Sequence, residues 1–273
     1  MDNFSDAQLV RKTVIATEAG VVASQHKRAA QVGAAVLAAG GDAVDAAVAT
    51  SFALGVVEPW MSGAMAGGCM VLWRADEQRA QVVDYGMRSP RGLDPKDYPL
   101  SGAGPSSDLF PWQAVVDDRN VQGATAVAVP GVVSGMGLAH ERYGRKPWRE
   151  MVQPAVQLAQ QGLLVDWYSG LVTASSARAL SQDPHAAAMF LDEGTWPIMG
   201  SWTSTTPRRL DQRALAVSLQ HIADEGPRAL YEGSLARALA LDVQAKGGCL
   251  AEADLAAYQA QWVDPLTVAY RGS

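Results

Sequence analysis

An almost uniformly apolar segment, residues 43–54, restricts the fold of this chain more than any other feature. It is rich in Ala, Val and Phe, and Asp42 stands directly before it. A carboxylate at that position accepts hydrogen bonds from the free amides of a helix start, and a helix without a polar face must be covered on most sides. The sequence therefore predicts a core helix that Asp42 caps.

Helical periodicity continues through most of the second half of the chain. Glycine stands where several of the predicted helices should end, as it commonly does at a helix C-terminus. Together with the core helix, the predicted helices cover residues 28–39, 43–54, 132–143, 148–161, 167–181, 208–225, 231–246 and 252–261.

Strand patterns are few. Two apolar runs, residues 69–73 and 81–85, flank a charged turn and predict a pair of strands, and residues 266–270 predict a further short strand. Asp84, near the end of the second run, is expected to hold the strand end by local hydrogen bonds. Residues 88–120 are rich in Pro, Gly, Ser and Asp and predict a long surface excursion. The expected fold class is a helix-rich α+β chain.

The length of 273 residues predicts one large domain over residues 17–273, preceded by a mobile arm of residues 1–16. The start of the chain lacks the basic region and the long apolar run of a secretory signal, so we expect a cytoplasmic protein. No segment is long and apolar enough to cross a bilayer, which predicts that the protein has no membrane partner.

The charge balance argues against a nucleic-acid partner. Lys and Arg total 22 against 28 Asp and Glu, a net charge of −6 that repels a phosphate backbone. The four histidines and two cysteines show no metal-ligand spacing. The glycine pair at residues 67–68 lacks the Lys and the Ser or Thr of a phosphate-binding loop. We therefore expect neither a metal nor an organic cofactor.

Short motifs that follow one another along the chain carry a family resemblance. Residues 40–50 read Gly-Gly-Asp-Ala-Val-Asp-Ala-Ala-Val-Ala-Thr, and residues 55–59 read Gly-Val-Val-Glu-Pro. The later motifs are the glycine-rich turn of residues 62–70, Val83-Asp84-Tyr85, Val129-Pro130-Gly131, Asp254-Leu255 to Tyr258, and Tyr270-Arg271-Gly272. In this order they resemble the γ-glutamyltranspeptidases and related acylases of the N-terminal-nucleophile hydrolase superfamily.

This resemblance implies the large-subunit part of an enzyme that matures by autocatalytic cleavage. The complete family protein is an αββα sandwich, in which the threonine exposed at the start of the small subunit attacks an amide with its own α-amine as base. Residues 203–206, Thr-Ser-Thr-Thr, precede Pro207 and a basic pair, so we interpret them as a loop and a helix cap rather than as that threonine segment. The resemblance thus implies a domain incomplete at its C-terminal end, a small subunit as partner and a small-molecule amide as substrate.

The resemblance also directs attention to the end of the second predicted strand. Family members that use γ-glutamyl donors carry Arg and then Glu after the Asp-aromatic pair, and the guanidinium grips the α-carboxylate of the donor. Here Gly86 and Met87 stand at those positions, and an arginine follows as Arg88. Arg88 is the leading candidate for a substrate contact, the alternative being a surface residue that pairs with a nearby acid. Tyr85 and Trp60 are candidates for the same pocket, or ordinary core residues.

Three functions remain open from these residues. A bound α-carboxylate without its clamp would be left unpaired, so the leading hypothesis is a threonine-dependent amidohydrolase or acylase whose acyl group is not γ-glutamyl. The second hypothesis is a γ-glutamyl transferase or glutathione hydrolase whose carboxylate clamp has moved to Arg88. The third is a non-catalytic homologue of the large subunit.

Overall fold

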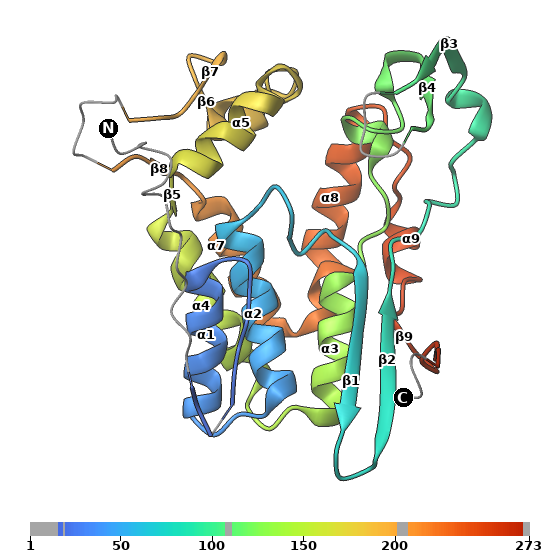
Figure 1. The fold of residues 1–273 in the computed structure, drawn as a ribbon. Helices are drawn as coiled ribbons and strands as arrows, with labels where there is room; N and C mark the ends of the chain where they lie inside the picture. The colour runs from blue at the N-terminus through green and yellow to red at the C-terminus, as the bar shows by residue number, and fades with distance from the viewer. Residues whose placement is uncertain (1–15, 19, 107–110, 201–206, 270–273) are drawn as a thin grey trace, which may run out of the picture.

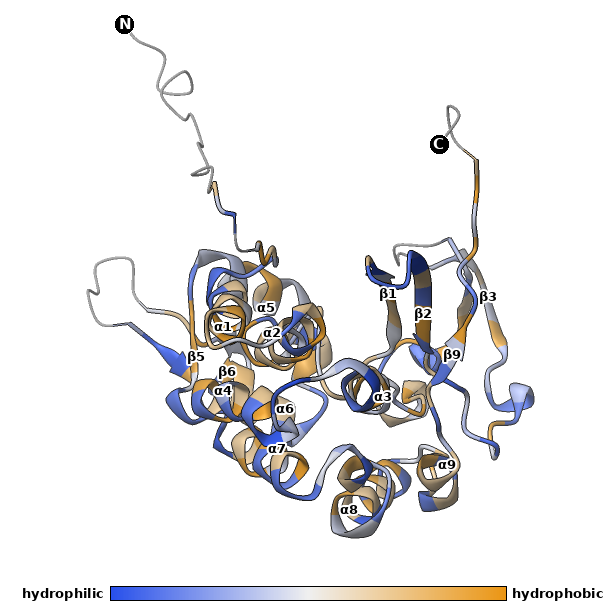
Figure 2. Cartoon of the chain, turned by 90° about the horizontal axis from the view of Figure 1, so that it is seen from below, coloured by the Kyte–Doolittle hydropathy of each residue, from blue (hydrophilic) through white to orange (hydrophobic). Residues whose placement is uncertain are grey.

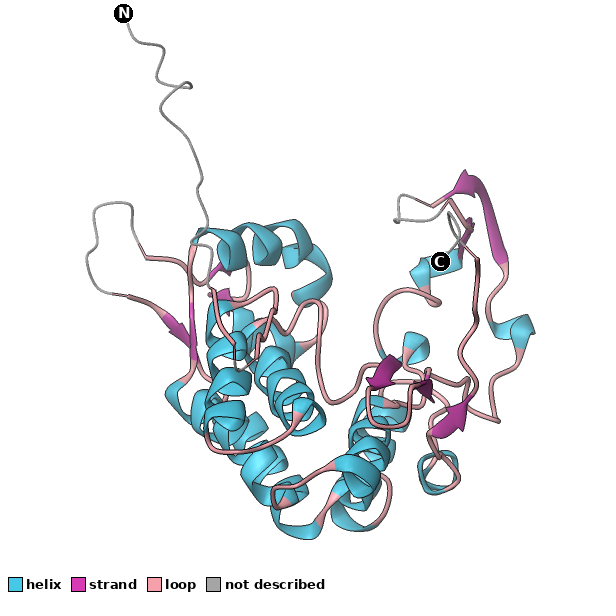
Figure 3. Ribbon diagram, turned by 60° about the horizontal axis from the view of Figure 1, so that its bottom comes forward, coloured by secondary structure: helices cyan, strands magenta, loops and turns pink. Residues whose placement is uncertain are grey.

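The molecule consists of a helical bundle and a strand-bearing part, with helix α3 (Val132–Tyr143) between them (Figure 1). In Figure 3 these two parts form the arms of a U that helices join at its base. Buried side chains from both parts belong to one hydrophobic cluster, so the described chain folds around a continuous core. This computed structural model describes residues 16–18, 20–106, 111–200 and 207–269, and most of the predicted N-terminal arm lies outside them.

Helix α2 (Ala43–Val57) is the central helix of the bundle. Asp42 caps it as predicted, because its Oδ1 accepts a hydrogen bond from the Val44 amide at 2.7 Å and the Asp45 carboxylate accepts one from the Asp42 amide at 2.9 Å. Most of its side chains are buried, which confirms the prediction of a covered core helix. The other helices of the bundle are α1 (Lys27–Ala38), α4 (Trp148–Gln161) and α7 (Arg213–Glu225).

A three-stranded antiparallel sheet stands beside α3. Its strand order is β1 (Gly68–Arg74), β2 (Arg79–Tyr85) and β9 (Gln261–Val263), and the first two confirm the predicted strand pair. Leu72 and Val83 are buried on one face, whereas Val71 and Trp73 on the opposite face are 69 % and 61 % exposed. Figure 2 shows α3 against one face of the strands, with the other face turned away from the helices.

Between α4 and α7 the chain forms a small segment that the sequence patterns predict only in part. Helix α5 (Trp167–Leu180) agrees with the prediction, but α6 (Pro184–Phe190) and the hairpin of β6 (Leu191–Asp192) and β7 (Trp196–Pro197) have no counterpart in it. Elements this short carry too few residues to show a periodicity.

The helix expected over residues 208–225 begins only at α7. The reason is a tertiary contact, because Arg209 and Leu210 form strand β8 (Arg209–Leu210), which pairs with β5 (Leu163–Leu164) across the end of α4. Such a two-residue ladder depends on a distant partner and leaves no local signal in the sequence.

The expected surface excursion of residues 88–120 is confirmed for its described residues, 88–106 and 111–120. It contains the ladder of β3 (Leu100–Pro105) and β4 (Gln113–Val115) and short 3-10 turns, and large side chains such as Leu100 and Trp112 are exposed on it. The Tyr98 hydroxyl donates a hydrogen bond to the Thr125 carbonyl at 2.7 Å, which links the excursion to the segment that follows it.

The last described part of the chain corrects two predictions. Helix α8 (Gly233–Ala245) matches its prediction closely, but α9 (Glu252–Ala256) stops well before residue 261, because the next residues cross to β2 and form β9. The strand expected over residues 266–270 is wrong for residues 266–269, which form no strand, and Tyr270 lies outside the described residues. Among the described helices, none has the length and apolar character needed to span a membrane.

Candidate functional site

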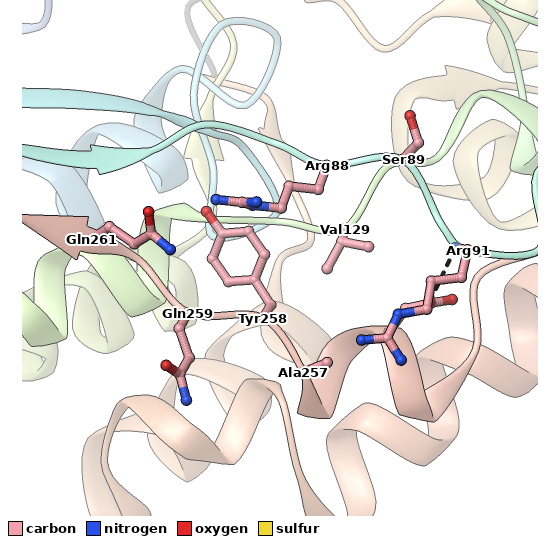
Figure 4. Close-up of a pocket in the computed structure, with 9 residues that line it drawn as sticks. Arg88, Ser89, Arg91, Val129, Ala257, Tyr258, Gln259 and Gln261 are labelled. Atoms are coloured by element: carbon pink, nitrogen blue, oxygen red, sulfur yellow. Dashed lines mark hydrogen bonds between the residues drawn. The ribbon is translucent and has the colours of Figure 1, made fainter. Parts of the chain in front are cut away.

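A pocket of about 300 Å³ lies where the end of β2 meets the segment that joins α9 to β9 (Figure 4). Three parts of the chain build it: the start of the excursion, Val129 before α3, and residues between Asp254 and Gln261. The side chains that line it are mainly polar and include two arginines and two glutamines. A pocket of this composition can recognise a polar or negatively charged group.

Arg88, the leading candidate from the sequence, lines this pocket. Its backbone is fixed by a pair of hydrogen bonds with Val129, whose amide donates to the Arg88 carbonyl at 2.8 Å and whose carbonyl accepts from the Arg88 amide at 3.3 Å. The side chain is exposed, and its guanidinium lies 6.0 Å from the centre of the Tyr258 ring. No described carboxylate forms an ion pair with it, so its charge is available to a ligand.

Tyr258 forms the floor beneath Arg88. It is 3 % exposed, and its hydroxyl donates a hydrogen bond to the Gly86 carbonyl at 2.8 Å. Burial raises the pKa of Tyr258, with the Asp84 carboxylate adding to the shift and the Arg88 guanidinium opposing it. The phenol therefore stays neutral near pH 7 and can serve as a hydrogen-bond donor.

The two arginines of the pocket point in different directions. In Figure 4 the Arg88 side chain extends over the Tyr258 ring toward Gln261, whereas Arg91 reaches down beside Ala257. The Arg91 amide donates a hydrogen bond to Asp254 Oδ1 at 3.1 Å, which anchors the far side of the pocket. Arg88 and Gln261 thus form one polar end of the pocket, and Arg91 stands at the other.

Asp84 holds the end of β2, as predicted. Its Oδ1 accepts a hydrogen bond from the Gly86 amide at 2.9 Å, a local turn that ends the strand. In the β2–β9 ladder Asp84 stands opposite Gln261. The Asp84 carboxylate therefore lies near the pocket but forms no ion pair with Arg88.

The other two candidates from the sequence do not line this pocket. Tyr85 is 9 % exposed, its hydroxyl donates to the Cys69 carbonyl at 3.1 Å, and burial raises its pKa to about 12. A Cβ on Gly135 of α3 would come within 2.3 Å of the Tyr85 ring, so this ring packs in the core. Trp60 lies at the end of α2, where its ring meets Tyr168 edge-on at 5.9 Å. Arg88, Tyr85 and Trp60 are therefore not brought together in one site.

Sequence reasoning missed the α9–β9 side of the pocket. In the sequence Tyr258 appears only as the end of a family motif, and Gln261 follows it three residues later. The contact between Tyr258 and Gly86 joins residues that are 172 positions apart in the sequence. The Tyr-x-x-Gln spacing after a short helix was the available signal, but only the pairing of β9 with β2 shows which strand end it meets.

The side chains that line this pocket are suited to recognising a polar group. The pocket contains guanidinium, amide and hydroxyl groups and the Asp254 carboxylate, Ser89 is its only hydroxyl besides the Tyr258 phenol, and no histidine lines it. The described residues also contain no group of three His, Cys, Asp or Glu side chains able to hold a metal ion. Residues 203–206, interpreted above as a loop, lie outside the described residues.

The sequence and the fold match one class of hydrolytic enzymes. A family model described as gamma-glutamyltranspeptidase matches residues 29–273. The chain belongs to the γ-glutamyltranspeptidase family.

Several relatives illustrate this membership. The chain is 39 % identical over 253 residues to the acylase ACY 1 proenzyme of Pseudomonas sp. (strain SE83), covering 93 % of this chain and 43 % of that protein. It is 33 % identical over 261 residues to the glutathione hydrolase proenzyme of Escherichia coli (strain K12), covering 93 % of this chain and 41 % of the relative. The chain therefore spans less than half the length of these curated relatives.

Solved structures agree with the sequence relatives. The γ-glutamyltranspeptidase of Helicobacter pylori superposes with a TM-score of 0.83 at 27 % identity, covering 96 % of this chain and 70 % of that one. The cephalosporin acylase of Bacillus halodurans gives a TM-score of 0.77 at 26 % identity, covering 99 % of this chain and 48 % of that one. The predicted helix-rich α+β class of the large-subunit region is confirmed.

Proposed function

We propose that this chain is the large-subunit part of an amide-cleaving enzyme whose nucleophilic threonine belongs to a small-subunit segment. The observation that carries the proposal is Arg88, an unpaired guanidinium in a pocket at the strand end where family members that use γ-glutamyl donors carry their clamp. The chain supplies one wall of the substrate site, and the missing threonine with its α-amine supplies the attack on the amide.

The acyl group of the proposed substrate is not γ-glutamyl. Gly86 leaves no side chain at the position of the usual arginine clamp, so the α-carboxylate of a γ-glutamyl group bound as in those family members would lack its bidentate partner. Arg88 stands two residues further along the chain and would hold a carboxylate at a different depth. The 39 % identity to an acylase proenzyme, against 33 % to the glutathione hydrolase proenzyme of Escherichia coli, supports the same reading. The second candidate function, a γ-glutamyl enzyme with a relocated clamp, is favoured by one observation, the free guanidinium of Arg88.

The uncovered face of the sheet supports the proposed small-subunit partner. Val71 and Trp73 point away from α3 and stand largely exposed, next to the half-buried Val82 on the neighbouring strand. An apolar sheet face of this kind is stabilised when a second layer covers it. In the proposed heterodimer the small subunit provides that layer.

The test uses the chain together with its proposed small subunit, hereafter the assembled protein. Three anilides form a matched series: γ-glutamyl, glutaryl, which lacks only the α-amino group, and butyryl, which also lacks the carboxylate. We expect hydrolysis of glutaryl anilide with kcat/KM at least equal to that of γ-glutamyl anilide. Arg88→Ala should lower kcat/KM for the glutaryl substrate by roughly 10-fold to 100-fold, since a charge-assisted hydrogen bond is lost.

Arg237→Ala, which removes a surface arginine of α8, is the matched control and should leave these constants unchanged. A clear preference for γ-glutamyl anilide would contradict the proposed acyl group and support the second candidate. If the assembled protein hydrolysed none of the three anilides, the proposed activity itself would be rejected.

A further inference from the structure

Tyr258 makes two contacts with the strand end that carries Arg88. Its hydroxyl donates to the Gly86 carbonyl at 2.8 Å, and its ring lies beneath the Arg88 guanidinium, 6.0 Å from the ring centre. Resting on the proposed function, we infer that Tyr258 is the positioning residue that holds Arg88 toward the carboxylate of a substrate. Arg88 is the side chain that touches the ligand, and Tyr258 acts through it.

Arg88 requires such a support because little else restrains its side chain. It stands where β2 has ended and the surface excursion begins, and no described carboxylate pairs with it. A free arginine side chain samples many rotamers, and ordering it on binding has an entropic cost. An aromatic face under the guanidinium restricts those rotamers before a ligand arrives, which favours binding.

Tyr258 is itself rigidly held, as a positioning residue must be. Its ring stacks on Tyr231 with centroids 5.6 Å apart and planes 11° from parallel. The Tyr231 hydroxyl donates to the Pro130 carbonyl and accepts from the Ser134 amide, both at 3.1 Å. The Tyr258 carbonyl accepts a hydrogen bond from Arg228 at 3.0 Å. Tyr258 is therefore held through Tyr231 against the start of α3, and it in turn restrains the strand end at Gly86.

Two glycines allow this close packing. A Cβ on Gly131 would come within 2.5 Å of the Tyr258 hydroxyl oxygen and 1.9 Å of the Tyr85 carbonyl, so only glycine fits there. The Gly86 carbonyl accepts the hydrogen bond from Tyr258, and a Cβ on Gly86 would lie 3.3 Å from Asp84 Oδ1. Gly131 thus allows Tyr258 to reach the strand end, and Gly86, which leaves the usual clamp position without a side chain, accepts its hydrogen bond.

Charges around the guanidinium agree with a carboxylate ligand. Gln261 faces the same end of the pocket and can donate a hydrogen bond through its amide, and the buried Tyr258 phenol is neutral. Two acids lie nearby. Asp84 Oδ1 accepts a hydrogen bond from the Gly86 amide, and Asp254, which lines the pocket, accepts hydrogen bonds from the Arg91 and Ala251 amides. Neither carboxylate forms an ion pair with Arg88, so its guanidinium is available to an anionic group of a ligand.

The test compares Tyr258→Leu and Tyr258→Phe in the assembled protein. Tyr258→Leu should lower kcat/KM for glutaryl anilide about tenfold, chiefly through KM, because the aromatic support is removed. Tyr258→Phe keeps the ring and should lose only about threefold. The double variant Arg88→Ala/Tyr258→Leu should be no worse than Arg88→Ala alone, since both changes remove one device.

Tyr98→Leu is the matched control. Tyr98 also donates from its hydroxyl to a carbonyl, at 2.7 Å, and also lies beneath an arginine, Arg119 at 5.9 Å, but it does not line the pocket. It should leave the preference for glutaryl over butyryl anilide unchanged. A thermal melt of each variant shows whether a loss arises from unfolding, and Tyr258→Phe keeps the test valid if Tyr258→Leu does not fold.

A second readout needs no activity. Phenylglyoxal modifies free arginines, and peptide mass spectrometry reports the rate at Arg88. Glutarate should slow this modification in the unsubstituted protein and fail to do so in Tyr258→Leu. If glutarate protects Arg88 only when Tyr258 is present, but the assembled protein hydrolyses no anilide, the proposed function is rejected and the role of Tyr258 in positioning Arg88 is retained. Equal losses of kcat/KM for glutaryl and butyryl anilides, with glutarate protection of Arg88 retained, would overturn the inference.

Discussion

At the scale of single residues, Asp45 shows a buried carboxylate held by backbone amides. It is fully buried, and its oxygens accept hydrogen bonds from the amides of Asp42 at 2.9 Å, Arg145 at 3.1 Å and Lys146 at 3.4 Å. His140 Nε2 lies 3.7 Å from it. These contacts tie the start of α2 to the turn between α3 and α4, so one side chain fixes the relative position of three helices.

Replacing Asp45 with Asn should destabilise the protein by about 3 kcal/mol, because the amide group would turn N–H donors toward backbone donors in a buried site. Urea unfolding of the assembled protein measures the change. Asp97→Asn, at an exposed position in the excursion, is the control and should shift the free energy of unfolding by less than about 0.5 kcal/mol. Similar unfolding midpoints for the two variants would show that the Asp45 contacts are dispensable.

Residues whose role is local could be predicted from the sequence, and residues whose role is long-range could not. Asp42 and Asp84 act on amides within three residues of themselves, so their cap and turn roles follow from the chain alone. Arg88 was found because a family motif marks its strand end. Tyr258 lies beneath it only because β9 pairs with β2, a contact for which local patterns give no signal.

At the scale of elements, α6 is attached to α8 by an ion pair. Asp183 caps α6 through the His185 and Ala186 amides, and its carboxylate also lies 2.7 Å from the Lys246 ammonium, just after α8. The hydrogen bond from Lys246 lowers the pKa of Asp183 to about 2, with the Ala186 amide contributing. Apart from this pair, α6 contacts mainly α5 and β6, so the ion pair is a principal tie to the strand-bearing side.

Asp183→Asn keeps a good helix cap and removes the charge, so it isolates the ion pair. The folded pKa of Asp183 lies below its unfolded value of about 3.9, so the pair stabilises the protein above about pH 4 and that contribution is lost as the pH falls toward 2. The thermal midpoints of the variant and the unsubstituted protein should therefore differ at pH 6 and converge as the pH approaches 2.

Hydrogen exchange gives the local readout for the same variant. Amides of α6 should exchange faster in Asp183→Asn at pH 6. The control is Asp211→Asn, which also has its pKa lowered to about 2, by Arg213, but which pairs within its own turn and joins no second element. Equal exchange in α6 for both variants would mean that packing rather than the Lys246 pair holds this helix.

The success of the helix predictions has the same physical basis. The helices at Val132–Tyr143 and Trp148–Gln161 match the sequence prediction at both ends, because Gly144 and Gly162 stop them and long periodic faces mark them. The short elements α6 and β6 escape prediction because they contain too few residues to show a repeating pattern, and β8 escapes it because its partner β5 is distant in the sequence.

At the scale of the whole molecule, the uncovered sheet face is the apolar surface that a partner would cover. Its apolar side chains lie on adjacent strands, with Val71 of β1 directly opposite Val82 of β2 and Trp73 opposite Ala80. The edge of β1 is also unpaired among the described strands. A face and an edge of this kind favour association with another chain.

The chain expressed without its proposed partner should therefore self-associate. The double variant Val71→Thr/Trp73→Thr should raise the monomer fraction, measured by sedimentation velocity. The same variant should assemble more weakly with the small subunit. Threonine keeps the strand preference, so the change acts on the face rather than on the fold. The matched control is Val217→Thr/Trp196→Thr, two residues 72 % and 69 % exposed on other elements, which should alter neither property. If both double variants reduced self-association equally, general surface hydrophobicity would explain the effect.

The behaviour of the isolated chain gives a second check. If it stays monomeric at high concentration and melts cooperatively, the fold is stable with the sheet face exposed, and a covering partner is not needed for its stability.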